Sequence, residues 1–348
     1  MVPAGFTEME TLWFWLVAIM IAGYVLLDGF DLGAGALHLF LAKTDDERTQ
    51  ILDSIGPFWD GNEVWLVAGG GTLYFAFPAL YASAFSGFYL PLMVVLWLLI
   101  LRGIAIESRH VMHHVVWSPF WDVVFSGASA LLAVFLGAAL GNVVRGVPLD
   151  ANGEFFLPFW TDFRVSANPG ILDWYTILVA VLALTTLLQH GALWVAYRTH
   201  EPIESRARAA ARKLWFAVLA LTPAVTVASV IVRPALFDNF TAYPAGAAFP
   251  LLALAGMGAI YRAETPLAGF FGSCAYIAGM LTSVVFSVYP SVLPGIGNPG
   301  LTIHNAAAPL YGLQIGLVWW VPAFLLACGY SAFVYRRFAG KVDKPAAT

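Results

Sequence analysis

Long apolar runs separated by short polar connections fill the chain from one end to the other. A membrane-spanning helix needs about 20 mostly apolar residues, and the runs predict about nine such helices. They cover roughly residues 11–41, 58–81, 83–107, 119–143, 171–197, 213–233, 247–262, 267–289 and 311–335. A short turn near residues 81–84 separates the second run from the third. The pattern predicts an all-α fold in which residues 1–348 form a single polytopic transmembrane domain.

The composition supports a membrane protein without a soluble catalytic domain. Only 11% of the residues are charged and 60% are hydrophobic, whereas a soluble domain usually carries about a quarter charged residues. Both cysteines lie in apolar runs, which argues against a disulfide framework. The sequence contains no nucleotide-binding loop, Ser/His/Asp set or zinc-ligand spacing. We therefore expect no metal site and no nucleic-acid partner.

Lysines and arginines gather on one side of the predicted membrane. With nine spans the connections alternate between the two sides, and fourteen of the 17 basic residues fall on one of them. The other three are Arg145, Arg164 and Arg233. The positive-inside rule then places the N-terminus outside and the C-terminus in the cytoplasm. The arginine-rich segment 198–213 is interpreted as a cytoplasmic membrane anchor by the same rule.

Two aspartates interrupt the first apolar run. Asp28 and Asp31 are three residues apart, so they share one face of a helix in the inner part of the bilayer. An ionised aspartate at the centre of a span costs roughly 2.5–3.5 kcal/mol. One interpretation is a buried polar pair that faces neighbouring helices, which the glycines at 29, 33 and 35 would let approach closely. The other is a hydrated path for protons or cations.

A second polar group opens the second run from the same side. Asp60 either caps the helix, with Glu63 completing a capping box, or extends the acid path. Arg102, at the inner end of the third run, either pairs with a buried acid or reaches the lipid headgroups, and the second interpretation is slightly favoured. A lone histidine such as His190 could bind a haem iron. No second histidine lies at a matching depth, so no haem ligation is expected.

Three motifs in a fixed order point to a known family. They are GYVLLDGFDLGAG at 23–35, GPFWDGNEVWLVAGGGTLYFAFP at 56–78 and YASAFSGFYLPLMVVLWLLILRG at 81–103. With LTIHNAA at 301–307, they resemble subunit II of the cytochrome bd quinol oxidases. The resemblance covers essentially the whole chain and is densest at 23–110. His304 departs from the pattern, because a tryptophan often precedes the asparagine in that family.

The resemblance implies a subunit of a quinol:oxygen oxidoreductase complex in the bacterial inner membrane, where it serves aerobic respiration. Haems b and d and the quinol-oxidising loop are then expected in a homologous partner, subunit I. This chain would ligate no cofactor and hold no catalytic residue. The implied fold is a peripheral helix followed by two four-helix bundles. Expected partners are subunit I, quinol or quinone, membrane lipids and a small single-span accessory subunit.

In this interpretation the acids of both motifs line a proton path from the cytoplasm toward the partner's haem: Asp28, Asp31, Asp60 and Glu63. Arg102 is the candidate charge partner. Trp59 and Trp65 are candidate contacts for a quinone ring or a lipid tail, with interfacial anchoring as the alternative. The alternative function is a stand-alone cation or proton-coupled transporter that uses the same acids. The repeated broken helices typical of transporters are not visible in the sequence.

Overall fold

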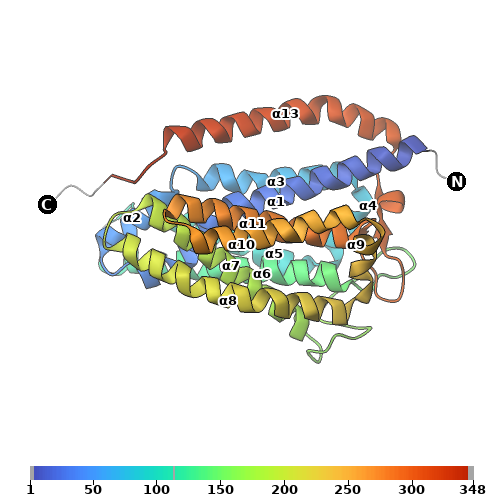
Figure 1. Ribbon diagram of the computed structural model, residues 1–348, viewed down its shortest axis with the longest axis horizontal. Coiled ribbons are helices and arrows are strands. Elements are labelled where there is room, and N and C mark those ends of the chain that lie inside the picture. Colours follow the sequence, from blue (N-terminus) through green and yellow to red (C-terminus); the bar gives the residue numbers. More distant parts are fainter. Residues whose placement is uncertain (1–3, 113, 344–348) are drawn as a thin grey trace.

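The computed structural model describes residues 4–112 and 114–343, and it is built mainly of helices (Figure 1). Eight helices within this part are long and apolar enough to cross a membrane. They are α1 (Ala4–Leu41), α5 (Tyr89–Ser108), α6 (Trp117–Arg145), α7 (Trp174–Arg198), α8 (Ile203–Val232), α10 (Ala248–Arg262, preceded by the 3₁₀ turn η2, Pro244–Ala247), α11 (Pro266–Val288) and α13 (Leu310–Arg337). The more polar α3 (Trp59–Ala76) runs beside α1 in the same layer (Figure 1). The expected multi-span all-α fold is confirmed.

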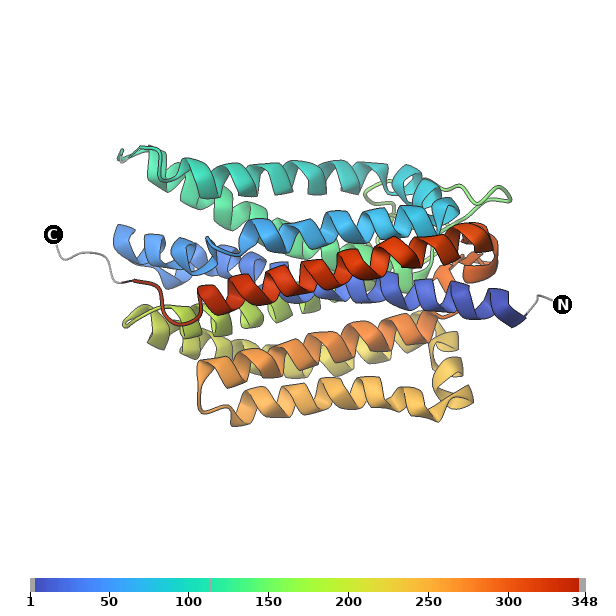
Figure 2. The same cartoon turned by 90° about the horizontal axis from the view of Figure 1, so that it is seen from above.

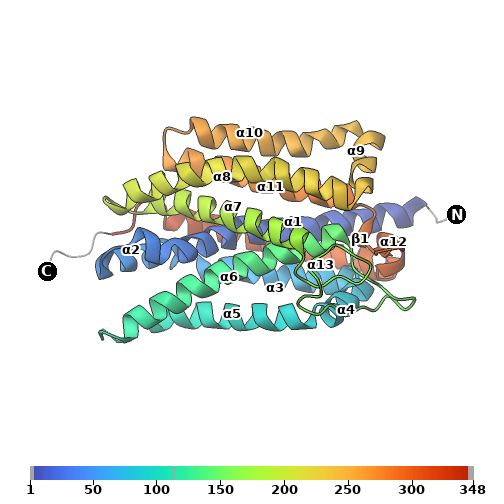
Figure 3. The same cartoon turned by 90° about the horizontal axis from the view of Figure 1, so that it is seen from below.

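The helices form two groups of four around α1 and α7. The first group is α1, α3, α5 and α6, and the second is α7, α8, α10 and α11 (Figure 3). Helix α13 lies at one edge of the assembly in Figure 1 and passes in front of the other helices in the view of Figure 2. Only 6% of its most apolar stretch is buried, against 39% for α1. The expectation that the peripheral helix comes first in the chain was wrong. One peripheral helix and two groups of four are present as the resemblance implies, but the peripheral helix follows the two groups in the chain.

The connection between the second and third spans is a short helix. Helix α3 ends at Ala76, and Phe77 leaves the helical conformation with φ −133° and ψ 66°. Pro78 then opens α4 (Pro78–Gly87), since proline is well suited to the first turn of a helix. Residues 81–84, which the sequence analysis expected to form the turn, therefore lie inside α4. That boundary was wrong because the break is set by the proline.

One end of the bundle, here called the loop end, carries the long connection 146–173 and several short elements (Figure 3). These are η1 (Pro234–Phe237), α9 (Asp238–Ala242), α12 (Ile303–Ala306) and an antiparallel pair of strands, β1 (Ser291–Leu293) and β2 (Leu301–Thr302). A buried ion pair between Arg145 and Asp173 joins the ends of α6 and α7. His304 Nδ1 lies 2.8 Å from Glu10 Oε2 and ties α12 to the start of α1.

The opposite end, here called the α2 end, carries the amphipathic helix α2 (Asp45–Ile55). Thr44 and Glu47 form a capping box at its start. Arg206, in the first turns of α8, lies 2.6 Å from Glu47, so the expected anchor segment 198–213 is largely helical and docked on α2. Burial raises the pKa of Glu47, but hydrogen bonds from Arg206 and the Lys43 backbone N–H outweigh it, and the net pKa is lowered.

The crossing of α1 and α7 depends on glycine. A Cβ added to Gly33 would lie 1.9 Å from the Leu187 carbonyl oxygen, so a side chain there must push the helices apart. We expect Gly33→Ala to lower the unfolding free energy by about 1–3 kcal/mol, the usual cost of overpacking. Thermal unfolding in detergent, followed by circular dichroism, measures this.

The control is Gly127→Ala in α6, where an added Cβ meets nothing within 4 Å. It should be neutral or slightly stabilising, because alanine favours helix. Equal unfolding midpoints for the two variants would contradict the close α1–α7 crossing.

Candidate functional site

A buried arginine holds two carboxyl groups from different helices. Arg102 of α5 places Nη2 2.7 Å from Asp28 Oδ1 of α1 and 3.0 Å from Glu63 Oε2 of α3. The side chains of Arg102 and Asp28 are fully buried, whereas that of Glu63 is 24% exposed. The favoured expectation that Arg102 reaches the headgroups was wrong. A buried acid on α1 faces it, and pairing compensates both charges.

Asp31 joins the same site through an asparagine. Asn62 Nδ2 donates to Asp31 Oδ2 at 2.7 Å and to the Leu27 carbonyl oxygen at 3.1 Å. Tyr335 of α13 donates its O–H to Asn62 Oδ1 at 2.8 Å. Four helices thus meet in what we call the deep cluster: Asp28, Asp31, Asn62, Glu63, Arg102 and Tyr335.

The deep cluster has more acid than base. It contains three carboxyl groups and a single guanidinium, and in a low-dielectric interior such an excess of negative charge is costly. The cluster becomes neutral only when some of its carboxyl groups hold protons. Such a group of interacting acids can exchange protons as a unit, with macroscopic rather than individual titration.

Asp60 stands apart from the deep cluster. Helix α3 begins at Trp59, and Phe58 at the N-cap position makes no side-chain capping bond, so the proposed capping by Asp60 and Glu63 was wrong. The Asp60 side chain is exposed and has no ion pair or hydrogen bond with any described residue. The structure thus brings together Asp28, Asp31 and Glu63, and it leaves Asp60 at the surface one turn from Glu63.

The two tryptophans of the second motif contact different neighbours. Trp65 packs over Gly23 of α1 and meets Phe324 of α13 edge-on, with ring centroids 5.9 Å apart. Trp59 lies against Gly103 of α5. Both indoles are half-buried.

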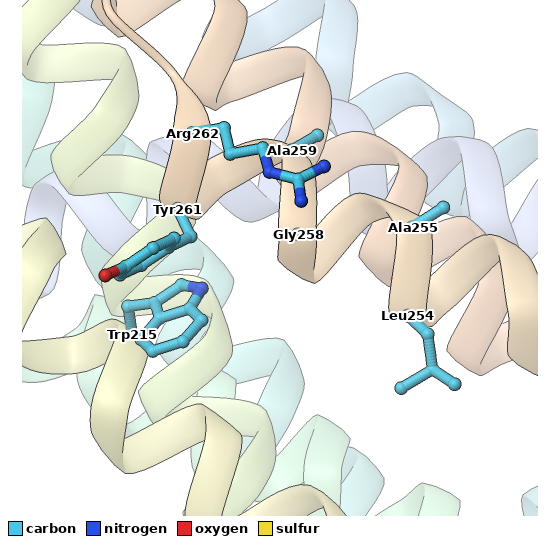
Figure 4. A pocket seen from close by; sticks show the side chains of 7 residues that line it. All are labelled: Trp215, Leu254, Ala255, Gly258, Ala259, Tyr261 and Arg262. Carbon is cyan, nitrogen blue, oxygen red and sulfur yellow. The ribbon is translucent and has the colours of Figure 1, made fainter.

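A separate groove lies on the second helix group. It is about 480 Å³ in volume and lies between α8 and α10, where Trp215, Tyr261 and Arg262 line it beside small residues of α10 (Figure 4). No member of the deep cluster lines this groove.

A second ionic cluster lies at the α2 end and was missed by the sequence analysis. Asp122 of α6 is fully buried, and its Oδ1 lies 2.7 Å from His38 Nε2. The same carboxyl group accepts from Arg109 Nε at 2.6 Å and from Arg48 Nη1 at 3.1 Å. Arg109 also lies 2.6 Å from Asp45. We call these five residues the rim cluster. The available signal was an acid early in an apolar run, at the end where basic residues gather.

His190, the candidate haem ligand within a span, has both ring nitrogens occupied by hydrogen bonds. His190 Nδ1 is hydrogen-bonded to Ser273 Oγ at 2.6 Å, and Nε2 to the Leu26 carbonyl oxygen at 3.0 Å. Its ring also stacks on Phe270 with centroids 4.6 Å apart. No group of three or more His, Cys, Asp or Glu side chains in the described ranges could hold a metal ion.

These features define a polytopic helical membrane protein that buries ionisable groups between its spans. A family model described as cytochrome bd terminal oxidase subunit II matches residues 9–338. The chain belongs to that family. It is a multi-pass protein of the bacterial inner membrane.

Similar proteins agree over nearly their whole length. The cytochrome bd ubiquinol oxidase subunit 2 of Bacillus subtilis is 30% identical, with 95% of this chain and 96% of that protein covered. The cytochrome bd-I ubiquinol oxidase subunit 2 of Escherichia coli K12 is 28% identical, with 96% and 95% covered. A chain in the bd oxidase structure from Geobacillus thermodenitrificans has the same fold, with a TM-score of 0.74 at 18% identity, covering 95% of this chain and 98% of that one. These comparisons give no support to the transporter alternative.

The ion pair between Arg102 and Asp28 should stabilise the fold, and a double mutant can measure the coupling energy between the two groups. Arg102→Gln leaves the Asp28 carboxylate buried and unpaired, which costs about 3–5 kcal/mol in comparable cases. Removing both charges in Arg102→Gln/Asp28→Asn should restore part of that loss. Unfolding midpoints in detergent give the coupling energy. A double mutant as unstable as the sum of the single mutants would show that the two groups do not interact.

Proposed function

We propose that this chain is the haem-free subunit II of a quinol oxidase that reduces oxygen to water. Its partner, subunit I, carries haems b and d and the quinol-oxidising loop. The observation that supports this most directly is the family match over residues 9–338. The relatives named above are subunits of ubiquinol oxidases, and they have nearly the same length as this chain.

We further propose that the α2 end faces the cytoplasm. Basic residues gather at that end, among them Arg48, Arg109 and Arg206. Such an excess of arginine and lysine is typical of the cytoplasmic side of a bacterial membrane. Helix α1 then begins outside and α13 ends in the cytoplasm.

In this orientation, we propose, the deep cluster takes up protons from the cytoplasm for oxygen reduction. Asp60 is exposed on the first turn of α3, and Glu63 is partly exposed one turn further in. Arg102 bridges Glu63 to the buried Asp28. A proton bound by Glu63 can therefore pass to Asp28 around a fixed guanidinium, which itself stays protonated.

Buried atoms of the deep cluster support a hydrated arrangement. Asp28 Oδ2, Asp31 Oδ1 and Arg102 Nη1 are buried and have no hydrogen-bond partner among the described residues. Buried polar groups are usually satisfied by protein or by ordered water. Water bound between these atoms would carry protons from Asp28 onward to the partner subunit.

The partner subunit is proposed to dock on the side of α3 and α13. An added Cβ at Gly70 or Gly71 of α3 meets nothing within 4 Å, so another chain could approach closely there. Large apolar side chains such as Trp97 of α5 and Trp319 of α13 are exposed on the neighbouring helices. Lipids, a quinone held near Trp59 or Trp65, and a small single-span accessory subunit are further proposed partners.

Neutralising the buried acids should slow the oxidase without removing its haems. We expect Asp28→Asn to lower the oxygen-consumption rate by about tenfold or more, the scale of a lost proton-transfer group. Glu63→Gln should have a smaller effect and Asp60→Asn the smallest, because water can replace an exposed carboxyl group. Oxygen uptake at saturating quinol and haem content from the visible spectrum measure the two quantities. Wild-type rates in Asp28→Asn and Glu63→Gln at neutral and alkaline pH would rule out a proton path through this chain.

A bulky side chain on α3 should prevent assembly. We expect Gly71→Leu to reduce the amount of haem-bearing partner that copurifies with a tag on this chain. Gly258→Leu in α10 is the matched control, because it also fills open space but lies on the second helix group. Equal haem yield from both variants would place the partner elsewhere.

A further inference from the structure

The deep cluster and the rim cluster lie on the same two helices, one above the other. Asp31 and His38 are seven residues apart on α1, so they face nearly the same way and lie about 10 Å apart along the axis. Arg102 of α5 and Arg109, the C-cap residue of α5, show the same spacing, and one arginine belongs to each cluster. The residues between the two arginines include Ala105 and Ile106, which are buried.

A buried serine lies between the two clusters. Gly35 is on the same face of α1, four residues after Asp31 and three before His38. A Cβ added to Gly35 would lie 2.2 Å from Ser129 Oγ of α6, so the serine hydroxyl occupies the space that a side chain at 35 would fill. Ser129 is fully buried.

Three polar atoms along this column have no protein partner within residues 4–112 and 114–343. They are Asp31 Oδ1, Ser129 Oγ and His38 Nδ1. His38 uses its other ring nitrogen, Nε2, for Asp122. Buried polar atoms without protein partners usually bind ordered water, which needs several polar neighbours. Asp31 Oδ1 and His38 Nδ1 on α1, with Ser129 Oγ of α6 beside Gly35 between them, provide such neighbours.

We propose that His38 and Ser129, with ordered water, form a second proton-uptake branch that leads from the rim cluster to Asp31. The proposal rests on the proposed function of the deep cluster. Solvent reaches the rim cluster, since the side chains of Asp45 and Arg48 are 58% and 27% exposed. The charged groups that face His38 there are Asp122, Arg48 and Arg109, with Asp45 beyond Arg109.

The transfer is balanced at each atom. Asp122 passes a proton to His38 Nε2, and the imidazole releases the proton on Nδ1 to water beside Ser129. That water passes a proton to Asp31, which gives one on to the deep cluster, and Asp122 takes up a proton from solvent at the rim. Tautomer exchange of the neutral imidazole then returns its proton from Nε2 to Nδ1. No electron moves, and the net result is one proton transferred from the rim to the deep cluster. His38 and Ser129 act here as positioning and relay residues, not as catalytic ones.

The chain offers a matched pair of serines for the test. Ser129 and Ser126 are both buried in α6, one turn apart, but Ser126 Oγ donates to the Ala36 carbonyl oxygen at 3.2 Å. Both serines would be changed to alanine in the intact oxidase complex. Oxygen uptake at saturating quinol would be measured from acidic to alkaline pH, in H₂O and in D₂O, with haem content from the visible spectrum.

We expect Ser129→Ala to lower the rate by about tenfold at alkaline pH, where protons are scarce, with little change at acidic pH. Its solvent isotope effect should rise. His38→Gln should show the same pH profile, because glutamine can bond Asp122 but cannot relay a proton between two ring nitrogens. Ser126→Ala should behave like the wild type, and all variants should keep their haems.

Two results would overturn the branch. One is a Ser129→Ala profile that matches Ser126→Ala at every pH. The other is loss of haem in Ser129→Ala but not in Ser126→Ala, which would make the serine structural. Asp28→Asn, measured in parallel, separates the two proposals. If Asp28→Asn consumes oxygen slowly and Ser129→Ala at the wild-type rate, only the proposed branch is refuted. If both variants consume oxygen at the wild-type rate, the whole proposed proton path is refuted.

Discussion

The arrangement of the first helix group depends on one buried guanidinium. Arg102 has no exposed surface, and removing an arginine from water is costly unless its charge is compensated at close range. Asp28 from α1 and Glu63 from α3 supply that compensation. Because both contacts are short, the three helices must keep a fixed depth and rotation relative to one another. The ion pairs therefore fix the relative depth and rotation of α1, α3 and α5.

The same constraint explains why α3 is polar where it enters the bundle. Asn62 links Asp31 to Tyr335, so it connects α1 with the peripheral α13. Glycine elsewhere on α1 serves close packing instead, as at Gly33 against α7. One face of α1 thus carries ionisable groups toward α3 and α5, and another carries Gly29 and Gly33 where α7 approaches closely. A helix that must hold acids and pack tightly cannot be uniformly apolar.

Much of the fold could be predicted from the sequence, because a lipid interior requires long apolar helices whose lengths are visible in the chain. The spacing of Asp28 and Asp31 also placed them correctly on one helix face. What failed depended on which helices are neighbours. Arg102 is buried because it pairs with an acid on another helix, and the rim cluster forms because three separate segments meet at Asp122. Neither contact can be seen in the local sequence. Capping was one of two interpretations of Asp60, drawn from local pattern alone, and it failed because α3 begins at the residue before Asp60.

The central claim is that the deep cluster exchanges protons during turnover while Arg102 stays charged. Infrared difference spectroscopy of the intact oxidase, recorded as the enzyme is reduced and reoxidised, detects protonated carboxyl groups through their C=O stretch. The account predicts a carboxyl band that shifts in D₂O and is lost in Asp28→Asn, with the haem spectrum unchanged. Identical carboxyl bands in the wild type and in Asp28→Asn would contradict it.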